Sequence, residues 1–404
     1  MVQRLGCAAA ADTLCRGRDA ARTVRWRLTV HAAMDAVLPP LTAAELREFC
    51  ENGFIVKRGA LSPAGCASAR DAYWASNRSA KVQRHDRSSW LGGFAEEDSS
   101  FLPENGGRLN QSGRMWVYRE PMGDPLLLDL VPRRVMPWLE QLLGKGQVQQ
   151  PIDGATEDPL RGSGQSGGKV VRGIYGNMPS SPDEAVVPVA EQHGHHVDPQ
   201  PCHVIVTAHL DDLPAQGGGT LLWPGSHRLL HRQNPVFANL MQATQFKEWS
   251  EEEKTWEGHP YVHCRWQERY REDYAVVADW VGKNITPVEF SGGEGDVLIW
   301  HSRCFHAGSR NFSGSVGEGT QPQIRQAVFY DCHKADMLTR DEADLPDDMW
   351  HDWSEDVRAA AAGTHTRSPR RNFLISRDVE GFACGCSAWA AACIGPGGEH
   401  GGDE

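Results

Sequence analysis

The sequence lacks the features that would point to a membrane, a nucleic acid or a disulfide scaffold. It has no apolar run of about 18 residues, so no segment should span a bilayer. The formal net charge of -12 leaves no broadly basic face, so nucleic acid is not an expected partner. The 11 cysteines include no Cys-x-x-Cys pair, which argues against a disulfide framework or a structural zinc site and favours a reducing compartment.

Targeting signals are also scarce. No secretory apolar region stands near the start, and the last residues match neither a retention nor a peroxisomal signal. Residues 1–34 are rich in alanine and arginine and poor in acidic residues, which leaves two interpretations open: an organelle transit peptide or an unstructured extension. We expect an intracellular protein, cytoplasmic by default, with import into an organelle as the alternative.

The sequence has ample material for a buried core. Hydrophobic residues make up 40% of the 404 positions, and 14 of the residues are tryptophan. We expect a single domain over residues 41–378. A disordered extension at 1–40 should precede it, and a flexible tail rich in glycine and alanine should follow it at 379–404.

The first part of this domain, 41–145, has helical signals. Thr42 and Glu45 form a capping-box pattern, and Ser62-Pro63 supplies an N-cap followed by proline at the first helical position. Pro132 should kink a third helix or divide it into two pieces. We therefore predict a helical support at the N-terminal side of the domain.

The region after residue 145 is rich in short β-type runs separated by glycine, proline and asparagine. Many short strands with long connections are typical of a two-sheet jelly roll rather than a parallel sheet. We predict a mainly β fold with helical support, whose core is a cupin-like double-stranded β-helix at about 169–332. An insertion at 230–282 should interrupt this core, and a helix at about 346–362 should follow it. Strands are expected near 169–175, 204–210, 220–223, 286–290, 296–300 and 323–330.

The clearest chemical motif is His196-Val197-Asp198. In an extended strand, residues i and i+2 point to the same face, so the imidazole and the carboxylate can bind one ion. Two histidines and one carboxylate on one face of an octahedral ion leave three positions open, as oxygen-activating iron(II) enzymes require. A second pair of this kind, His209-Leu210-Asp211, fits better as the end of a strand that runs into a turn.

Further motifs follow in order, and together with the His-x-Asp they resemble the phytanoyl-CoA dioxygenase family of iron(II)- and 2-oxoglutarate-dependent oxygenases. The resemblance runs from about residue 41 to residue 353. It implies iron(II), 2-oxoglutarate and dioxygen as cofactors and co-substrates, with ascorbate as an optional reductant. The motifs that carry it are Gly-Gly-Gly-Thr at 217–220, Pro-Gly-Ser-His at 224–227, Gly-Asp-Val at 295–297, Phe-His-Ala-Gly-Ser at 305–309 and Gln-Ile-Arg at 323–325.

The resemblance also implies roles for individual residues. His196, Asp198 and His306 match the three iron ligands of the family. Arg325 matches the arginine that pairs with the distal carboxylate of 2-oxoglutarate, and a guanidinium offers the two parallel donors that a carboxylate fits. A Gly/Ser insert lengthens the spacing between His306 and Arg325, which leaves Arg310 as a second candidate for the anchor. Three more residues are expected to line the same pocket: His209, Asn177 and Tyr175.

Other histidines nearby have structural interpretations. His193 and His195 lie in the approach to the His-x-Asp, and we expect them to be loop residues. His301 is opposite in strand parity to His306, which favours a structural role. His227 is expected to cap a turn.

These residues and the resemblance predict a dioxygenase that hydroxylates an unactivated C–H bond and releases succinate and carbon dioxide. The expected substrate is a small molecule or an acyl or lipid-like compound, and the sequence specifies neither it nor the oligomeric state. Two alternatives stay open. The chain could be an inactive metal-binding relative that acts as a sensor or scaffold, or a cupin-type oxygenase that works without 2-oxoglutarate.

Overall fold

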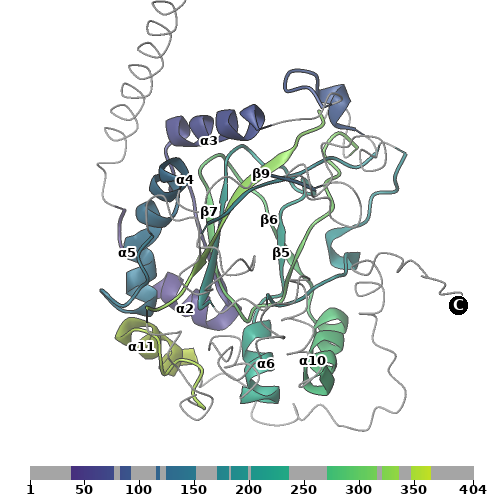
Figure 1. Ribbon diagram of the computed structural model, residues 1–404. Helices are drawn as coiled ribbons and strands as arrows, with labels where there is room; N and C mark the ends of the chain where they lie inside the picture. Colours follow the sequence, from purple (N-terminus) through teal and green to yellow (C-terminus); the bar gives the residue numbers. More distant parts are fainter. Residues whose placement is uncertain are drawn as a thin grey trace, which may run out of the picture.

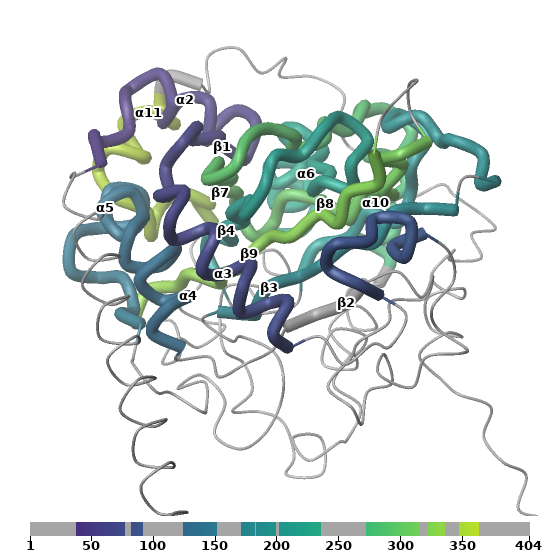
Figure 2. Tube along the Cα trace, turned by 90° about the horizontal axis from the view of Figure 1, so that it is seen from above, coloured from purple at the N-terminus to yellow at the C-terminus, as the bar shows by residue number. Residues whose placement is uncertain are grey.

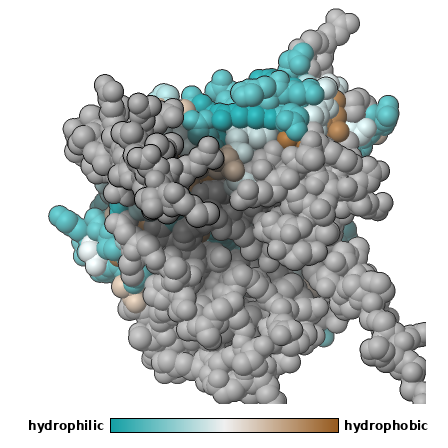
Figure 3. Space-filling model, turned by 45° about the horizontal axis from the view of Figure 1, so that its top comes forward, coloured by the Kyte–Doolittle hydropathy of each residue, from teal (hydrophilic) through white to brown (hydrophobic). Residues whose placement is uncertain are grey.

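The structure is a computed structural model, and the part that it describes comprises ten segments. Among these residues, no helix combines the length and apolarity needed to cross a bilayer. Their large exposed apolar side chains are Val186, 41% exposed, and Val288, 47% exposed, and the described surface in Figure 3 is largely hydrophilic. The described segments are 38–76, 82–91, 115–118, 124–151, 171–181, 183–198, 202–235, 271–315, 321–335 and 347–364.

The N-terminal helices form where the sequence signals predict them. Helix α2 (Ala43–Asn52) starts with a complete capping box, since Thr42 Oγ1 accepts from the Glu45 amide at 3.2 Å and Glu45 Oε2 accepts from the Thr42 amide at 2.8 Å. Helix α3 (Pro63–Ala75) starts at the Ser62 N-cap. The proline at position 132 divides the next helical run into α4 (Pro125–Leu130) and α5 (Pro132–Leu143), as expected.

Two antiparallel sheets face each other and make the jelly-roll core (Figure 1). The six strands predicted after residue 145 are confirmed, with ends displaced by no more than two residues, while β2 and β8 were not predicted. The larger sheet has the order β1-β7-β4-β9-β3-β2, with β1 Phe54–Lys57, β7 Val297–His301, β4 Val204–His209, β9 Arg325–Cys332, β3 Val171–Asn177 and β2 Met115–Tyr118. The smaller sheet has the order β6-β5-β8, with β6 Val288–Phe290, β5 Thr220–Leu222 and β8 His306–Gly308.

The alternation of side chains along each strand divides the core into layers. On β4, Val204 and Val206 belong to the apolar cluster shared with α2, α3, α4 and α5 on the outer face of the larger sheet. Ile205 points the other way and packs with Leu222 and Phe290 between the two sheets. Figures 1 and 2 show α3, α4 and α5 along the larger sheet. The inner face of this sheet therefore carries an apolar layer, and the polar residues that a ligand can use lie beside that layer.

Three further helices close the molecule. Helices α6 (Ser226–Gln233) and α10 (Arg271–Asn284) pack on the outer face of the smaller sheet through a second apolar cluster. They flank the predicted insertion, of which 236–270 lies outside the described residues. Helix α11 (Glu355–Thr364) packs beside α2. Most of the predicted extension and the whole tail also lie outside the described residues.

Two expectations were wrong. The helix predicted at 346–362 begins only at Glu355, because Ser354 accepts from the Val357 amide and the residues from 347 to 353 form turns. His227 does not cap a turn. It lies inside α6, fully buried, with its ring 5.3 Å from that of His301.

Candidate metal centre

Three side chains converge at one end of the space between the sheets: His196, Asp198 and His306. Their ligand atoms all lie within 4.8 Å of one another. Nε2 of His196 is 3.6 Å from Oδ1 of Asp198, and Nε2 of His306 is 3.5 Å from Oδ2. The backbone brings the two histidines together, since the His196 amide donates to the His306 carbonyl at 2.9 Å and the His306 amide donates back at 2.8 Å.

Backbone carbonyls fix the tautomer of both histidines. Nδ1 of His196 lies 2.9 Å from the carbonyl oxygen of Gly194, and Nδ1 of His306 lies 3.1 Å from that of Cys304. Because a carbonyl can only accept, each Nδ1 carries the proton and donates it. Each Nε2 therefore presents its lone pair toward the shared space, which is the arrangement of a metal-binding imidazole.

The protonation states also suit a cation. Burial opposes ionisation of Asp198, yet Arg172 and His306 outweigh it and hold the pKa of this carboxyl well below its usual range. Removal from water by the surrounding chain lowers the pKa of His196 to about 4, and the neighbouring His306 acts in the same direction. At neutral pH the centre thus offers one carboxylate and neutral imidazole, a donor set that fits iron(II) and leaves three coordination positions open.

Arg325 starts β9 on the inner face of the larger sheet and is 3% exposed. Its Nε donates to the carbonyl oxygen of Gly218 at 2.9 Å, while Nη1 has no hydrogen-bond partner among the described residues. Burial lowers the pKa of Arg325 to about 10, which still leaves a cation at neutral pH. A buried cation with an unused donor is costly unless an anion pairs with it, so this position fits a carboxylate ligand.

The three predicted pocket residues lie around Arg325. His209 ends β4 and stacks on Phe290, with ring centroids 4.0 Å apart and both ring nitrogens without hydrogen-bond partners among the described residues. Burial, with Arg325 adding to it, lowers the pKa of His209 to about 3, so this ring is neutral. Asn177 pairs with Arg325 across the β3–β9 ladder. Tyr175 lies two pairs further along, edge-on to Phe329 at 4.9 Å.

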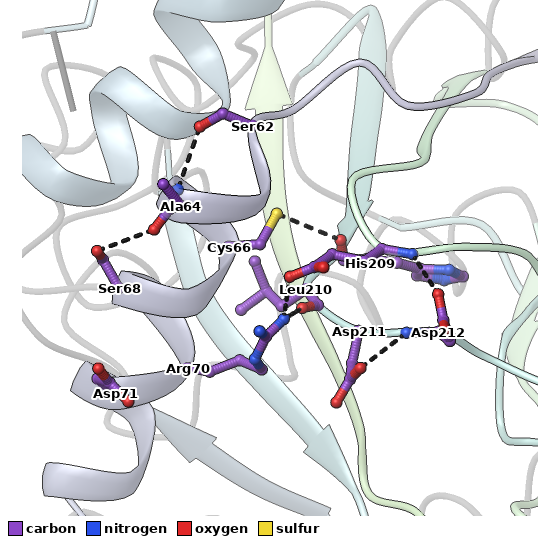
Figure 4. A network of polar contacts seen from close by, with 12 residues as sticks. Ser62, Ala64, Cys66, Ser68, Arg70, Asp71, His209, Leu210, Asp211 and Asp212 are labelled. Atoms are coloured by element: carbon purple, nitrogen blue, oxygen red, sulfur yellow. Dashed lines mark hydrogen bonds and ion pairs between the residues drawn. The ribbon is translucent and has the colours of Figure 1, made fainter. Parts of the chain in front are cut away.

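Helix α3 holds the end of β4 that carries His209, as Figure 4 shows. The thiol of Cys66 donates to the His209 carbonyl at 4.0 Å. The Arg70 guanidinium donates to the Leu210 carbonyl and pairs with Glu294 on the turn before β7. No local pattern indicates this network, because its partners are far apart along the chain. It explains how a neutral histidine is kept in a fixed place beside Arg325.

The other candidates for the metal centre and the 2-oxoglutarate anchor make their contacts with other parts of the protein. Arg310 pairs with Glu184, and its side chain is 42% exposed, so its position suits a carboxylate ligand less well than that of Arg325. The His195 ring lies 2.7 Å from the Ala278 carbonyl and so links the metal-site segment to α10. His301 is outside the site, where its ring stacks on Trp353 at 4.9 Å.

The analysis of the sequence missed one residue that touches the centre. Arg172 of β3 lies 2.7 Å from Oδ2 of Asp198 and pairs with Asp331 of β9. Its contacts are 26 and 159 residues away in sequence, and no local pattern connects them.

The fold and the donor set together place this chain among the iron(II)- and 2-oxoglutarate-dependent dioxygenases, whose core is a cupin-like jelly roll. It belongs to the phytanoyl-CoA dioxygenase family, because the sequence profile of that family matches residues 49–316. The match includes His196, Asp198 and His306 and ends before Arg325. No curated relative matches the sequence.

Several solved structures are similar to this chain at low identity. EctD from S. alaskensis, solved with 2-oxoglutarate and 5-hydroxyectoine, is 12% identical, with 74% of this chain and 77% of that chain covered and a TM-score of 0.36. HygX from Streptomyces hygroscopicus, solved with iron bound, is 13% identical, with 72% and 87% covered and a TM-score of 0.33. The carbocyclase SnoK from nogalamycin biosynthesis is 14% identical, with 73% and 88% covered and a TM-score of 0.32.

Proposed function

We propose that the protein hydroxylates an unactivated C–H bond of a small-molecule, acyl or lipid-like substrate, with release of succinate and carbon dioxide. In this proposal His196, Asp198 and His306 hold iron(II), and Arg325 holds the distal carboxylate of 2-oxoglutarate. The observation that carries it is the convergence of three ligand atoms within 4.8 Å of one another, in the same core as a buried arginine with an unused donor.

Asn177 connects the two halves of the proposed site. Its Nδ2 donates to the carbonyl oxygens of Gly218 and Ser309, at 3.3 and 2.8 Å, and so joins the Arg325 end to the chain that leaves β8. Ser309 is three residues beyond His306, at most roughly 10 Å of extended chain. This short segment therefore ties the loop that binds Arg325 to the strand that carries His306.

The remaining residues exclude water and orient the cofactor. Leu298, Trp300 and Phe290 line the inner layer near His209, and all three are nearly or fully buried. An apolar lining strengthens the pairing of Arg325 with a carboxylate and limits side reactions with water. Iron with 2-oxoglutarate supplies the oxidising power when bound, while the chain supplies the geometry and the dry surroundings.

Anaerobic ultraviolet–visible titration of iron(II) and 2-oxoglutarate into the metal-free protein tests this function. We expect a weak charge-transfer band in the wild type and none in His306→Ala. Arg325→Ala should need at least ten-fold more 2-oxoglutarate for half of the band, because the loss of a charge-assisted bidentate pair costs about 1.5–3 kcal/mol. Arg310→Ala is the matched control and should titrate like the wild type, since Arg310 pairs with Glu184.

The other outcomes have definite meanings. If saturating iron(II) and 2-oxoglutarate give no band in the wild type, the oxygenase function is wrong and a metal-binding sensor or scaffold replaces it. If iron(II) binds but 2-oxoglutarate changes nothing, the protein is a cupin-type oxygenase of another kind. If Arg310→Ala rather than Arg325→Ala weakens the band, the anchor is Arg310.

A further inference from the structure

Arg172 lies between two buried carboxylates. Its Nε donates to Oδ2 of Asp331 at 2.7 Å and its Nη2 donates to Oδ1 at 2.6 Å, so the two side chains form a bidentate pair. The same Nη2 lies 2.7 Å from Oδ2 of Asp198 as an ion pair. The Arg172 side chain is 16% exposed, that of Asp198 12% and that of Asp331 2%.

The sheet itself produces this arrangement. Strands β3 and β9 are antiparallel neighbours, and their register shifts between Val171 and Gly173. The irregularity leaves Arg172 outside the regular pairing, and its side chain meets Asp331 on the inner face. Asp331 lies opposite Ile205 of β4, which also faces the space between the sheets. The arginine is thus held by a central strand of the larger sheet rather than by a loop.

The three proposed ligands are oriented by different means. His196 and His306 are each fixed by a backbone carbonyl, at Gly194 and Cys304. A carboxylate has no such ring proton, and it can rotate unless a neighbouring group holds it. The structure places a guanidinium beside Asp198, 2.7 Å from Oδ2 as an ion pair, and this guanidinium is itself fixed by two hydrogen bonds to Asp331.

We infer that Arg172 is a positioning residue of the metal centre: Asp331 holds Arg172, and Arg172 fixes the rotation of the Asp198 carboxylate. This inference rests on the proposed role of Asp198 as an iron ligand. Before any metal binds, the ion pair holds the buried carboxylate toward the space shared with the two histidines. Groups that orient metal ligands in this way typically account for about 10- to 100-fold of the metal affinity.

The test is the dissociation constant for iron(II), measured anaerobically by calorimetry, together with thermal unfolding of the metal-free protein. Arg172→Met should weaken iron(II) binding by about 10- to 100-fold. Asp331→Asn should weaken it less, because Arg172 stays but loses a charged partner, and Arg172→Lys should restore part of the affinity. The control is Arg133→Met on α5, which removes a 2.6 Å ion pair with Asp129 of α4 and should leave the affinity unchanged.

The outcomes separate this inference from the function on which it rests. If the wild type does not bind iron(II), the proposed function fails. If the wild type binds iron(II) and Arg172→Met binds it within about three-fold, the positioning role is wrong, whatever happens to the unfolding temperature. If Arg172→Met does not fold, Asp331→Asn and Arg172→Lys decide: wild-type affinity in both overturns the inference, and weaker binding in both supports it.

Discussion

Arg325 and Asn177 face each other across the β9–β3 ladder, and both side chains donate to the carbonyl oxygen of Gly218. The distances are 2.9 Å from Nε of the arginine and 3.3 Å from Nδ2 of the asparagine. Asn177 thereby stabilises the loop at Gly218, whose carbonyl oxygen binds one edge of the Arg325 guanidinium. Under the proposed function, the carboxylate of 2-oxoglutarate binds the other edge of Arg325, which includes Nη1.

Asn177→Ala should therefore weaken 2-oxoglutarate binding while iron(II) binding stays the same. Loss of hydrogen bonds of this kind costs about 0.5–1.5 kcal/mol, so the half-saturating 2-oxoglutarate concentration should rise roughly 2- to 10-fold. The measurement is the charge-transfer titration at saturating iron(II). Asn284→Ala, which removes a 2.8 Å bond to the Trp280 carbonyl on α10, is the control. Equal titration curves for the two variants would show that Asn177 has no part in the pocket.

Gly218→Ala should disturb both the fold and the cofactor site. Gly218 has φ +87, and a Cβ there would lie 2.5 Å from Nδ2 of Asn177 and 2.8 Å from Cβ of Asn311. The left-handed conformation and the clash together should cost about 1–3 kcal/mol of stability, seen in urea unfolding, and should also weaken 2-oxoglutarate binding. Gly146→Ala is the matched control, because Gly146 has φ +71 but nothing within 4 Å of the added carbon. Gly146→Ala should show only the smaller loss of stability that comes from the left-handed conformation. Equal losses of stability in the two variants would contradict a clash at Gly218.

Acid should destabilise the protein through its buried histidines. His301 is fully buried, and burial, followed by the charge of Arg303, holds its pKa well below 6.5. His227, His203 and His231 act on it in the same direction. The unfolded chain takes up a proton below about pH 6.5 while the folded protein does not, so stability is full above that pH and falls below it. Each such histidine lowers the free energy of unfolding by up to about 1.4 kcal/mol for each pH unit below its unfolded pKa.

The measurement is the midpoint of thermal unfolding between pH 7.5 and pH 5, compared with His301→Phe. The phenyl ring keeps the stacking on Trp353 and cannot take up a proton, so the decline toward low pH should become shallower. His351→Phe makes the same substitution at an exposed position and should keep the wild-type slope. A slope that His301→Phe leaves unchanged would assign the acid sensitivity to other groups.

Ligand removal should lower the unfolding temperature. A ligand that binds the folded state alone stabilises it by about 2.7 kcal/mol at a hundred-fold excess over its dissociation constant. Iron(II) with 2-oxoglutarate should therefore raise the unfolding midpoint by several degrees, and a chelator should reverse the rise. Asp198→Ala should abolish the response, whereas Asp279→Ala, which loses only the exposed pair with Lys283, should retain it. A full response in Asp198→Ala would exclude Asp198 as a ligand.

The metal-site residues and the strands could be predicted because their signals are local. A His-x-Asp needs only the two-residue repeat of an extended chain, and the fold follows from many short β runs with long connections. The helix starts at Thr42 and Ser62 were equally readable, because a capping side chain bonds to its own first turn. Strand β8, with only three residues, was too short to show a period.

What the sequence did not reveal depends on contacts between distant segments. Arg172 resembles any polar residue of a strand until β9 brings Asp331 beside it. The helix predicted at about 346–362 begins only after Ser354, and Trp350 and Trp353 of the preceding turns pack against the ring of Phe49. His227 looked like a turn residue because its burial is set by α2 and by Trp350 rather than by its neighbours in sequence.

The length of strand β9 sets a distance between two residues near the metal centre. Arg325 and Asp331 share its inner face six residues apart, roughly 20 Å along the strand, so one strand sets the interval between the proposed anchor of 2-oxoglutarate and the carboxylate that binds Arg172. Removing one residue would turn one of them to the opposite face, and removing two would keep the face but shorten the interval by about 7 Å. The chain before the strand can lengthen, as the insert at 313–319 shows. The length of β9 therefore constrains this protein, as does the identity of the residues in the strand.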